Sequence, residues 1–312
     1  MICPVCDKSI SKTISNELRD GSRRDVFFCE QCELGVLDAK QSEAELKTFY
    51  ATEYRQIGKP KLDSNSDASD LFNAYEKFQT DRINILKPYF AKNMRLLEFG
   101  CSSGMFLYHA KKYLKEIVGV DYDKASTEFA SKKCNCVVYN GNIRETKEQK
   151  ESFDIAVAFQ TLEHVGDPKD FIEQMKEYTR KGGVIAIEVP NLYDALVHVY
   201  DLPYHKKFFY HKSHLWYFTE KSLKKLMLKA GIKGKVFHIQ DYNVMNHINW
   251  ILNDRPQPNN LPGLNLPTLP LRSVKKEIRN KLLNFFIDVD KKYKKILNNN
   301  KITSNILFVG KK

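Results

Sequence analysis

Long hydrophobic runs are missing from this chain. No stretch approaches the ~18 uncharged apolar residues that can span a bilayer. The N-terminus, MICPVCDKSI, has no basic segment followed by an apolar one, so we expect no signal peptide. Cysteine is scarce, and the odd total of seven does not suit a disulfide framework. These absences predict a cytoplasmic protein without a membrane span.

What remains is ordinary for a globular protein. Hydrophobic residues make up 42% of the 312 residues and charged residues 28%. The chain is therefore long enough to bury a full α/β core and to carry one or two small additional modules. Composition does not indicate an oligomeric state.

Four of the cysteines form two CxxC pairs near the N-terminus. Cys3 and Cys6 are separated by 22 residues from Cys29 and Cys32, which is the spacing of a zinc ribbon. Four thiolates complete a tetrahedral Zn²⁺ site and leave no position for water, so we expect the ion to be structural. The segment between the pairs mixes basic and acidic residues and is not a strongly basic face.

From residue 95 onward, apolar strands alternate with amphipathic helices. This alternation predicts a parallel α/β sheet with helices on both faces. Strands are expected at 95–99, 116–121, 136–139, 153–159, 183–189, 235–240 and 304–310, and helices at 104–114, 124–132, 168–180 and 219–230. The predicted organisation is a zinc ribbon at 1–40, a helical linker region at 41–92 and an α/β domain at 93–312.

Local structure can also be predicted for the segments outside this alternation. A short helix is expected at 42–50, a polar loop at 56–70 and a longer helix at 71–92. The glycines of Lys181–Gly183 are expected to end the helix before them. Residues 245–303 interrupt the alternation as a proline-rich loop followed by a basic amphipathic helix.

The stretch Leu96–Leu107, LLEFGCSSGMFL, joins an apolar strand to a helix through a glycine turn. Such a turn lets the backbone approach a ligand closely and directs helix amides toward it. The next strand ends on Asp121, and an acid in that place can accept hydrogen bonds from the two ribose hydroxyls of a nucleoside. Together, these features predict a nucleoside pocket. No second nucleotide-binding half is present, so a dinucleotide dehydrogenase is disfavoured.

Five motifs in order make the chain resemble the class I S-adenosylmethionine-dependent methyltransferases. They are LEFGC…G, GVD, the Gly141-Asn142 pair, FD…LEH and KGG…PN. The likeness covers about residues 95–244 and 304–312 and implies a Rossmann-like seven-stranded sheet. The ribbon followed by FYATEY is also similar to methyltransferases of sugar and surface-glycan pathways.

The resemblance implies a set of cofactor-binding residues. Asp121 would hold the ribose hydroxyls, Tyr122 would pack on the adenine and Asn142 would meet the adenine amine. Ser102 stands where the family usually has glycine, and Asn142 where it often has aspartate. The full set is Glu98, Gly100, Ser102, Gly104, Asp121, Tyr122, Asn142 and Gln160.

Histidines are concentrated where the acceptor of the methyl group is expected. Four of the eight lie between residues 198 and 214, directly after the fifth strand, and His164 follows the fourth strand. Histidine can take a proton near neutral pH. We therefore expect His164, His211 or His214 to act as general base, with Glu163 as an orienting group. Nearby tyrosines and lysines, Tyr204, Lys206, Lys207, Tyr210 and Lys212, suit an acceptor with phosphate or sugar hydroxyls.

The net charge of +12 is concentrated in 272–301, which has ten basic and three acidic residues. Its apolar residues recur at helical spacing, so we expect one buried apolar face and one solvated lysine face. The favoured function is methyl transfer to a small or glycan acceptor, such as a hydroxyl of a nucleotide-linked sugar in polysaccharide biosynthesis. The alternatives are an RNA methyltransferase docking through ribbon and basic helix, and a non-enzymatic zinc-ribbon binding module.

Overall fold

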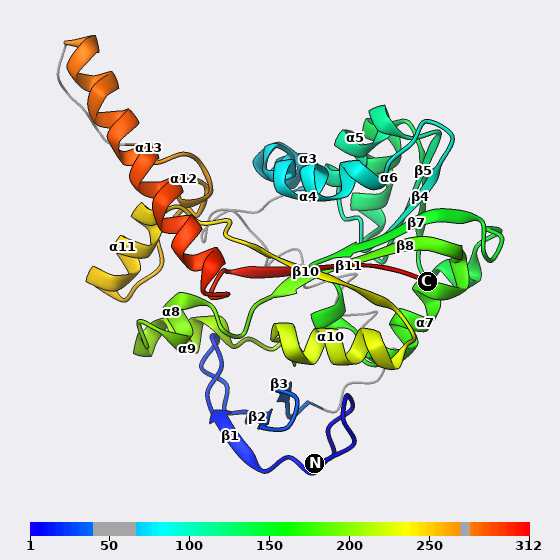
Figure 1. Ribbon diagram of the computed structural model, residues 1–312, viewed down its shortest axis with the longest axis horizontal. Helices are drawn as coiled ribbons and strands as arrows, with labels where there is room; N and C mark the ends of the chain where they lie inside the picture. Colours follow the sequence, from blue (N-terminus) through cyan, green and yellow to red (C-terminus); the bar gives the residue numbers. More distant parts are fainter. Residues whose placement is uncertain (40–66, 269–274) are drawn as a thin grey trace.

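The computed structural model describes residues 1–39, 67–268 and 275–312, so the helix expected at 42–50 and most of the loop expected at 56–70 lie outside the described residues. The centre of the molecule is a seven-stranded sheet with the order β10-β11-β8-β7-β4-β5-β6 (Figure 1). β11 runs antiparallel to both neighbours, and the five strands from β8 to β6 are parallel. This confirms the predicted fold class. The strands are β4 (Arg95–Phe99), β5 (Glu116–Asp121), β6 (Val137–Asn140), β7 (Phe153–Phe159), β8 (Thr179–Pro190), β10 (Lys233–Ile239) and β11 (Asn305–Lys311).

Helices cover both faces of this sheet because successive strand residues point to opposite sides. Leu96 belongs to the apolar core beneath α4, α5 and α6, whereas its neighbour Leu97 belongs to the core beneath α7 and α10. Both side chains are fully buried. The helices are α4 (Thr80–Leu86), α5 (Met105–Ala110), α6 (Lys124–Cys134), α7 (Pro168–Tyr178) and α10 (Glu220–Lys229), with short 3-10 turns η3 (Lys111–Tyr113), η4 (Ile143–Glu145) and η5 (Leu162–His164).

The prediction of one continuous helix over 71–92 is wrong. The segment begins earlier, with α3 (Ala68–Tyr75), because Asp67 and Asp70 form a reciprocal capping box. It then breaks into η1 (Glu76–Phe78), α4 and η2 (Lys87–Tyr89). Pro88 has no N–H to donate, which ends α4 in a tighter turn.

The glycines of Lys181–Gly183 do not end a helix. α7 ends at Tyr178, and β8 already begins at Thr179. Gly182 adopts φ +74° and pairs with the chain end, since its N–H donates to the Lys312 carbonyl at 3.1 Å. The glycines therefore bend an extended strand.

Several short elements lie beyond the carboxyl ends of the parallel strands. They come from residues 190–218, between β8 and α10, and from residues 244–264, between β10 and α13. α11, which lies at the start of the expected proline-rich loop, was not predicted. The elements are α8 (Ala195–His198), α9 (Pro203–Phe209), β9 (Trp216–Tyr217), α11 (Val244–Asn253) and α12 (Leu261–Leu264) (Figure 1).

The N-terminal module is joined to the main domain through a second sheet. Its strands β1 (Lys12–Ser15), β2 (Val26–Cys29) and β3 (Leu34–Leu37) continue into β9, with Gly35 opposite Tyr217 and Val36 opposite Trp216. Thr219 donates to the Glu33 carbonyl at 3.2 Å, and Lys229 pairs with Asp7. The module is therefore packed against the domain along its length.

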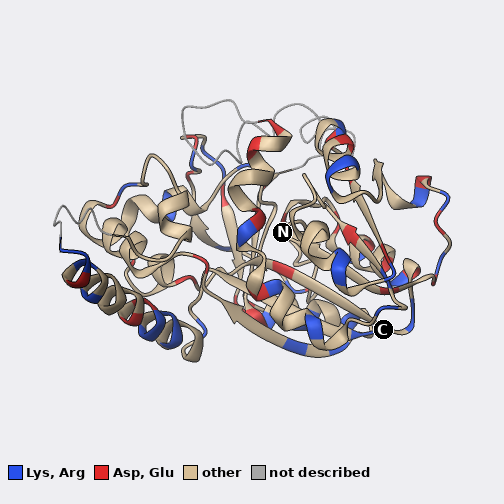
Figure 2. Ribbon diagram, turned by 90° about the horizontal axis from the view of Figure 1, so that it is seen from above, with Lys and Arg blue, Asp and Glu red and all other residues tan. Residues whose placement is uncertain are grey.

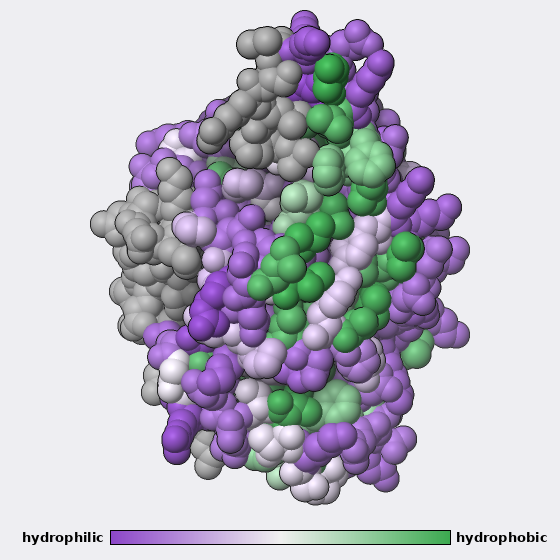
Figure 3. Space-filling model, turned by 90° about the vertical axis from the view of Figure 1, so that its left-hand side faces the viewer, coloured by the Kyte–Doolittle hydropathy of each residue, from purple (hydrophilic) through white to green (hydrophobic). Residues whose placement is uncertain are grey.

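α13 (Lys276–Asn299) extends away from the body at its N-terminal end (Figure 1). Basic residues occur along it, as expected (Figure 2). Its predicted apolar face is not buried, because Ile278, Leu282 and Phe285 are 48%, 43% and 61% exposed. The helix meets the domain toward its C-terminal end, where Asp290 and Leu297 are buried. Hydrophobic stripes consequently cross this side of the molecule (Figure 3).

Among the described residues, we find no helix that is both long and apolar enough to cross a bilayer.

Candidate active site

A cavity of about 950 Å³ opens at the carboxyl ends of the parallel strands. Its walls come from elements far apart in sequence. The sheet supplies Glu98, Asp121 and Gln160, the helices beyond the sheet supply Trp250, and the N-terminal module supplies Arg19. Carboxyl ends of parallel strands meet at one sheet edge, which is where ligands bind in open α/β sheets.

The glycine turn after β4 forms one end of this cavity. Gly100 adopts φ +69°, and a Cβ placed on it would lie 2.3 Å from Thr161 Oγ1. Ser102 also adopts a left-handed conformation, with φ +47°. A left-handed conformation costs a non-glycine residue about 1–2 kcal/mol, so glycine would be the less strained residue at this position.

Asp121 is held at the end of β5 by backbone donors. Its Oδ2 accepts from the Ser102 N–H at 2.8 Å and its Oδ1 from the Asp123 N–H at 2.9 Å. These bonds fix the plane of the carboxylate, and each oxygen keeps a second lone pair for a ribose hydroxyl. Burial raises the pKa of Asp121, while the two backbone donors oppose that rise.

Glu98 lines the same end of the cavity and is 4% exposed. Its Oε2 atom is buried without a hydrogen-bond partner. Burial raises the pKa of Glu98 well above its ordinary value, and Arg82 counteracts that rise. A buried carboxylate oxygen of this kind fits a ligand that brings a cationic donor, such as the ammonium group of S-adenosylmethionine.

Of the four remaining predicted cofactor residues, Tyr122, Asn142 and Gln160 also line the cavity, whereas Gly104 does not. Gly104 is instead the N-cap of α5, at φ +81°. Tyr122 follows Asp121 directly. Asn142 caps η4, because its side-chain oxygen accepts from the Arg144 N–H at 2.9 Å. Gln160, at φ +52°, donates to Glu188 Oε1 at 3.0 Å and to Asn305 Oδ1 at 3.2 Å.

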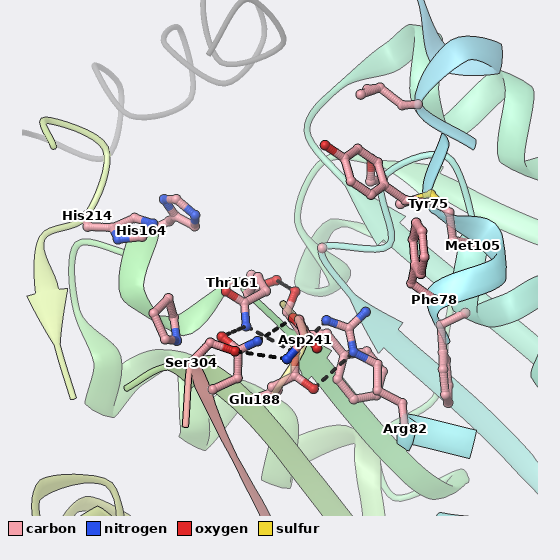
Figure 4. A pocket seen from close by; sticks show the side chains of 18 of the residues that line it. Tyr75, Phe78, Arg82, Met105, Thr161, His164, Glu188, His214, Asp241 and Ser304 are labelled. Atoms are coloured by element: carbon pink, nitrogen blue, oxygen red, sulfur yellow. Dashed lines mark hydrogen bonds and ion pairs between the residues drawn. The ribbon is translucent and has the colours of Figure 1, made fainter. Parts of the chain in front are cut away.

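A charged network at the centre of the cavity was missed by the sequence analysis (Figure 4). Arg82 on α4 donates to both carboxylate oxygens of Glu188 on β8, and a third bond runs to Gln79 at 2.9 Å. Asp241 accepts from Asn305 Nδ2 at 2.6 Å. Burial raises the pKa of Asp241 to about 7, with the nearby Glu188 as a further cause. Glu188 lies within the KGG…PN motif, but nothing in the sequence singles out Arg82 or Asp241.

The structure brings Glu163, His164 and His214 together. His164 Nε2 lies 3.8 Å from Glu163 Oε1, and His214 Nε2 lies 4.0 Å from the same atom. The two histidines line the cavity on the side opposite Tyr75 and Phe78 (Figure 4). Burial raises the pKa of Glu163 to about 8 and lowers the pKa of His164 to about 4.

His211 is the predicted histidine that does not line the cavity. Its ring packs against His214 with 3.6 Å between centroids, and its Nδ1 lies 2.6 Å from Ser213 Oγ. We therefore assign His211 a supporting position behind His214 and do not retain it as a base.

The expected tyrosines and lysines of the same segment are likewise not part of the cavity wall. Lys206 pairs with Asp201, and Lys207 pairs with Glu17 at 2.7 Å. Tyr210 is buried in the core beside Leu18. Two other residues of α9, His205 and Phe208, do line the cavity.

The four cysteines of the N-terminal module lie close together, as predicted. Cys3 Sγ is 3.4 Å from Cys32 Sγ, and Cys6 Sγ is 3.4 Å from Cys29 Sγ. Sulfur ligands on a tetrahedral zinc ion are about 3.8 Å apart, given Zn–S bonds of about 2.3 Å. All four can approach one ion together, so the donor set fits Zn²⁺.

A family model described as a methyltransferase domain matches residues 71–234, which is more than half of the chain. The chain therefore belongs to this methyltransferase family. A probable S-adenosylmethionine-dependent methyltransferase of Mycolicibacterium smegmatis is 30% identical over 97 residues, which are 31% of this chain and 38% of that protein. A ubiquinone biosynthesis O-methyltransferase of Pelagibacter ubique is 29% identical over 104 residues, 32% of this chain and 43% of that one.

The chain spans about two-fifths of the length of these curated relatives. A solved structure of phosphoethanolamine N-methyltransferase 2 from Haemonchus contortus, in complex with S-adenosylmethionine, superposes with a TM-score of 0.50 at 15% identity. The superposition covers 89% of this chain and 61% of that protein. This likeness shows that the methyltransferase fold extends over most of the molecule.

Proposed function

We propose that this protein transfers a methyl group from S-adenosylmethionine to a hydroxyl of a small acceptor. The observation that carries the proposal is one cavity that contains the glycine turn, Asp121 and the histidine pair His164 and His214. When bound, S-adenosylmethionine supplies an electrophilic methyl carbon on a sulfonium. The remaining chemistry is alignment of the acceptor and removal of its proton.

Residues at the sheet edge would hold the cofactor. Asp121 would accept from the ribose hydroxyls, and Glu98 would accept from the ammonium group at the methionine end. The turn from Gly100 to Gly104 allows close approach of the backbone, with Ser102 inside it. Tyr122 and Asn142 would contact the adenine, and Gln160 would form the floor near the sulfonium.

His164 is our first choice for the group that takes the hydroxyl proton. Its Nδ1 bonds to the Ser213 carbonyl at 2.7 Å, and a carbonyl can only accept, so Nδ1 carries the proton. Nε2 then holds the lone pair. Glu163 and His214 lie beside it and would orient the imidazole or the acceptor.

The acceptor is proposed to be a sugar hydroxyl of a nucleotide-linked sugar or polysaccharide precursor. Support comes from the mixture of bidentate charged groups and aromatic faces in the cavity. Arg82, Glu188 and Asp241 can bond several hydroxyls, while Tyr75 and Trp250 offer faces on which a sugar ring can stack. Arg19 of the N-terminal module adds a cation to the wall.

The module is proposed to hold a structural Zn²⁺ on Cys3, Cys6, Cys29 and Cys32. Such an ion would fix β1 and β2, which flank the turn that carries Arg19. The Arg19 guanidinium stacks on Phe208 with 3.7 Å to the ring centroid. Docking of RNA is the less favoured use, because Arg19 of this module lines the cavity and the rest of the module mixes basic and acidic residues.

Isothermal titration of S-adenosylmethionine into the full chain tests the cofactor site. We expect micromolar binding that Asp121→Ala weakens at least tenfold, since a hydrogen bond to a charged group is worth about 1.5–3 kcal/mol. Glu128→Gln, an exposed carboxylate on α6, serves as the matched control. Equal binding by wild type and Asp121→Ala would refute the assigned site.

A further inference from the structure

Three metal-ligating side chains meet at the end of β7, outside the cysteine module. Glu163, His164 and His214 each offer one ligand atom, and these atoms lie within 4.8 Å of one another. Glu163 is 1% exposed, and neither of its carboxylate oxygens has a hydrogen-bond partner. A buried carboxylate without any donor calls for an explanation, because such groups are almost always satisfied.

A hydrogen bond beside the cluster presents a histidine lone pair to Glu163. The Ser213 carbonyl binds His164 Nδ1–H at 2.7 Å, which fixes the tautomer with its Nε2 lone pair directed at the carboxylate. Outer-shell bonds of this kind, from the second ring nitrogen to a backbone carbonyl, accompany histidines that ligate metals. The His164 Nε2 lone pair and the Glu163 carboxylate, both acceptors, therefore lie side by side.

We propose that Glu163, His164 and His214 bind one divalent transition-metal ion at the acceptor end of the cavity. Two imidazoles and one carboxylate suit zinc, iron and similar ions of borderline softness, whereas magnesium prefers oxygen ligands. Ligand atoms on a tetrahedral zinc ion are about 3.3 Å apart, given bonds of about 2.0–2.1 Å. The imidazole nitrogens lie 3.8 and 4.0 Å from Glu163 Oε1, and all three ligand atoms lie within 4.8 Å of one another, so metal binding would draw them together by at most about 1.5 Å.

The site would leave coordination positions open toward the cavity, which His164 and His214 line. This part of the inference rests on the proposed function. An acceptor hydroxyl bound to the ion would have a lowered pKa and would lose its proton to water before the methyl transfer. The ion would then replace His164 as the means of activating the acceptor.

Metal binding to the full chain tests the proposal. After the thiolate site has been saturated with one equivalent of zinc, cobalt(II) is added and its visible absorption is recorded. We expect a second equivalent to bind with ligand-field bands and without thiolate charge-transfer bands. Glu163→Gln and His214→Gln should each lose this second equivalent, while retaining the first and the thermal melting profile.

His109→Ala provides the matched control, because His109 also pairs with a glutamate, Glu76, at 2.8 Å but outside the cluster. It should keep both equivalents. A wild-type chain that binds no metal beyond the thiolate site overturns the proposal, as does a second equivalent that survives Glu163→Gln.

Failure of this proposal is distinguishable from failure of the proposed function. Titration with S-adenosylmethionine reports on Asp121 and Glu98, neither of which belongs to the cluster. If the chain binds the cofactor but no second metal ion, only the proposed metal site is refuted. If the chain binds a second metal ion but not the cofactor, the proposed methyl transfer is refuted and the proposed metal site is supported.

Discussion

At the scale of single residues, the glycine turn leaves no room for a side chain at Gly100. Gly100→Ala would place a Cβ 2.3 Å from Thr161 Oγ1 on a residue at φ +69°. We expect it to lower the free energy of unfolding by at least about 1–2 kcal/mol, the cost of the left-handed conformation alone. It should also weaken cofactor binding, because Thr161 must move.

Gly182→Ala is the matched control for that substitution. Gly182 also has a positive φ, +74°, but nothing lies within 4 Å of the Cβ position. Urea unfolding should show a smaller loss for Gly182→Ala and unchanged cofactor affinity. Equal effects of the two substitutions would contradict the assigned close approach at Gly100.

A second residue-scale prediction concerns Arg82 and Glu188. Their bidentate pair is nearly buried, with 18% and 2% of the side chains exposed. Arg82→Leu leaves the Glu188 charge buried without its cation, which costs about 3–5 kcal/mol. We expect a marked fall in the melting temperature by calorimetry, and a smaller one for Arg82→Leu combined with Glu188→Gln. No rescue by the double substitution would refute the pairing.

At the scale of elements, α10 is tied to the sheet by an ionic cluster that depends on pH. Glu220 Oε2 lies 3.0 Å from His238 Nε2 and 3.0 Å from Lys301 Nζ. Burial favours a higher pKa for Glu220, but Lys224, His238 and Lys301 outweigh it and lower the pKa to about 2. A depressed carboxyl pKa stabilises the fold above the unfolded pKa of about 4.3 and loses this contribution as the pH falls toward 2.

Glu220→Gln should therefore be less stable than wild type at pH 7, and the difference should shrink between pH 4 and pH 2. Urea midpoints for both proteins across that range measure it. A difference independent of pH would show that the Glu220 charge does not contribute.

Strand positions could be predicted from the sequence because each buried strand is a short apolar run bounded by turn residues, as in IVGVD and FDIAVAF. Pro88 marks the later break of the 71–92 segment in the sequence, whereas the earlier break, at Gln79, has no proline or glycine beside it. The exposed apolar side of α13 was also missed, because helical periodicity shows that a face exists but not whether anything covers it. Asp121 and the four cysteines carried sequence signals, whereas Arg82 and Asp241 reach the cavity only through tertiary packing.

At the scale of the whole molecule, the N-terminal module and the main domain share a sheet through β3 and β9. Removal of the zinc ion that we propose for the module, with a chelator, should therefore loosen β9 as well as the module. Hydrogen exchange at Trp216 and Tyr217 should accelerate, while β4 and β5 stay protected. Unchanged exchange at β9 would show that the module folds without the metal.

We propose above that the cavity at the sheet edge transfers a methyl group to a small hydroxyl acceptor. Transfer of labelled methyl from S-adenosylmethionine into a lysate of the source cells, with and without ribonuclease, tests it most directly. We predict label in the small-molecule or glycan fraction, insensitive to ribonuclease and abolished by Asp121→Ala. Label that disappears on ribonuclease treatment, or no label from a protein that binds the cofactor, would contradict the account.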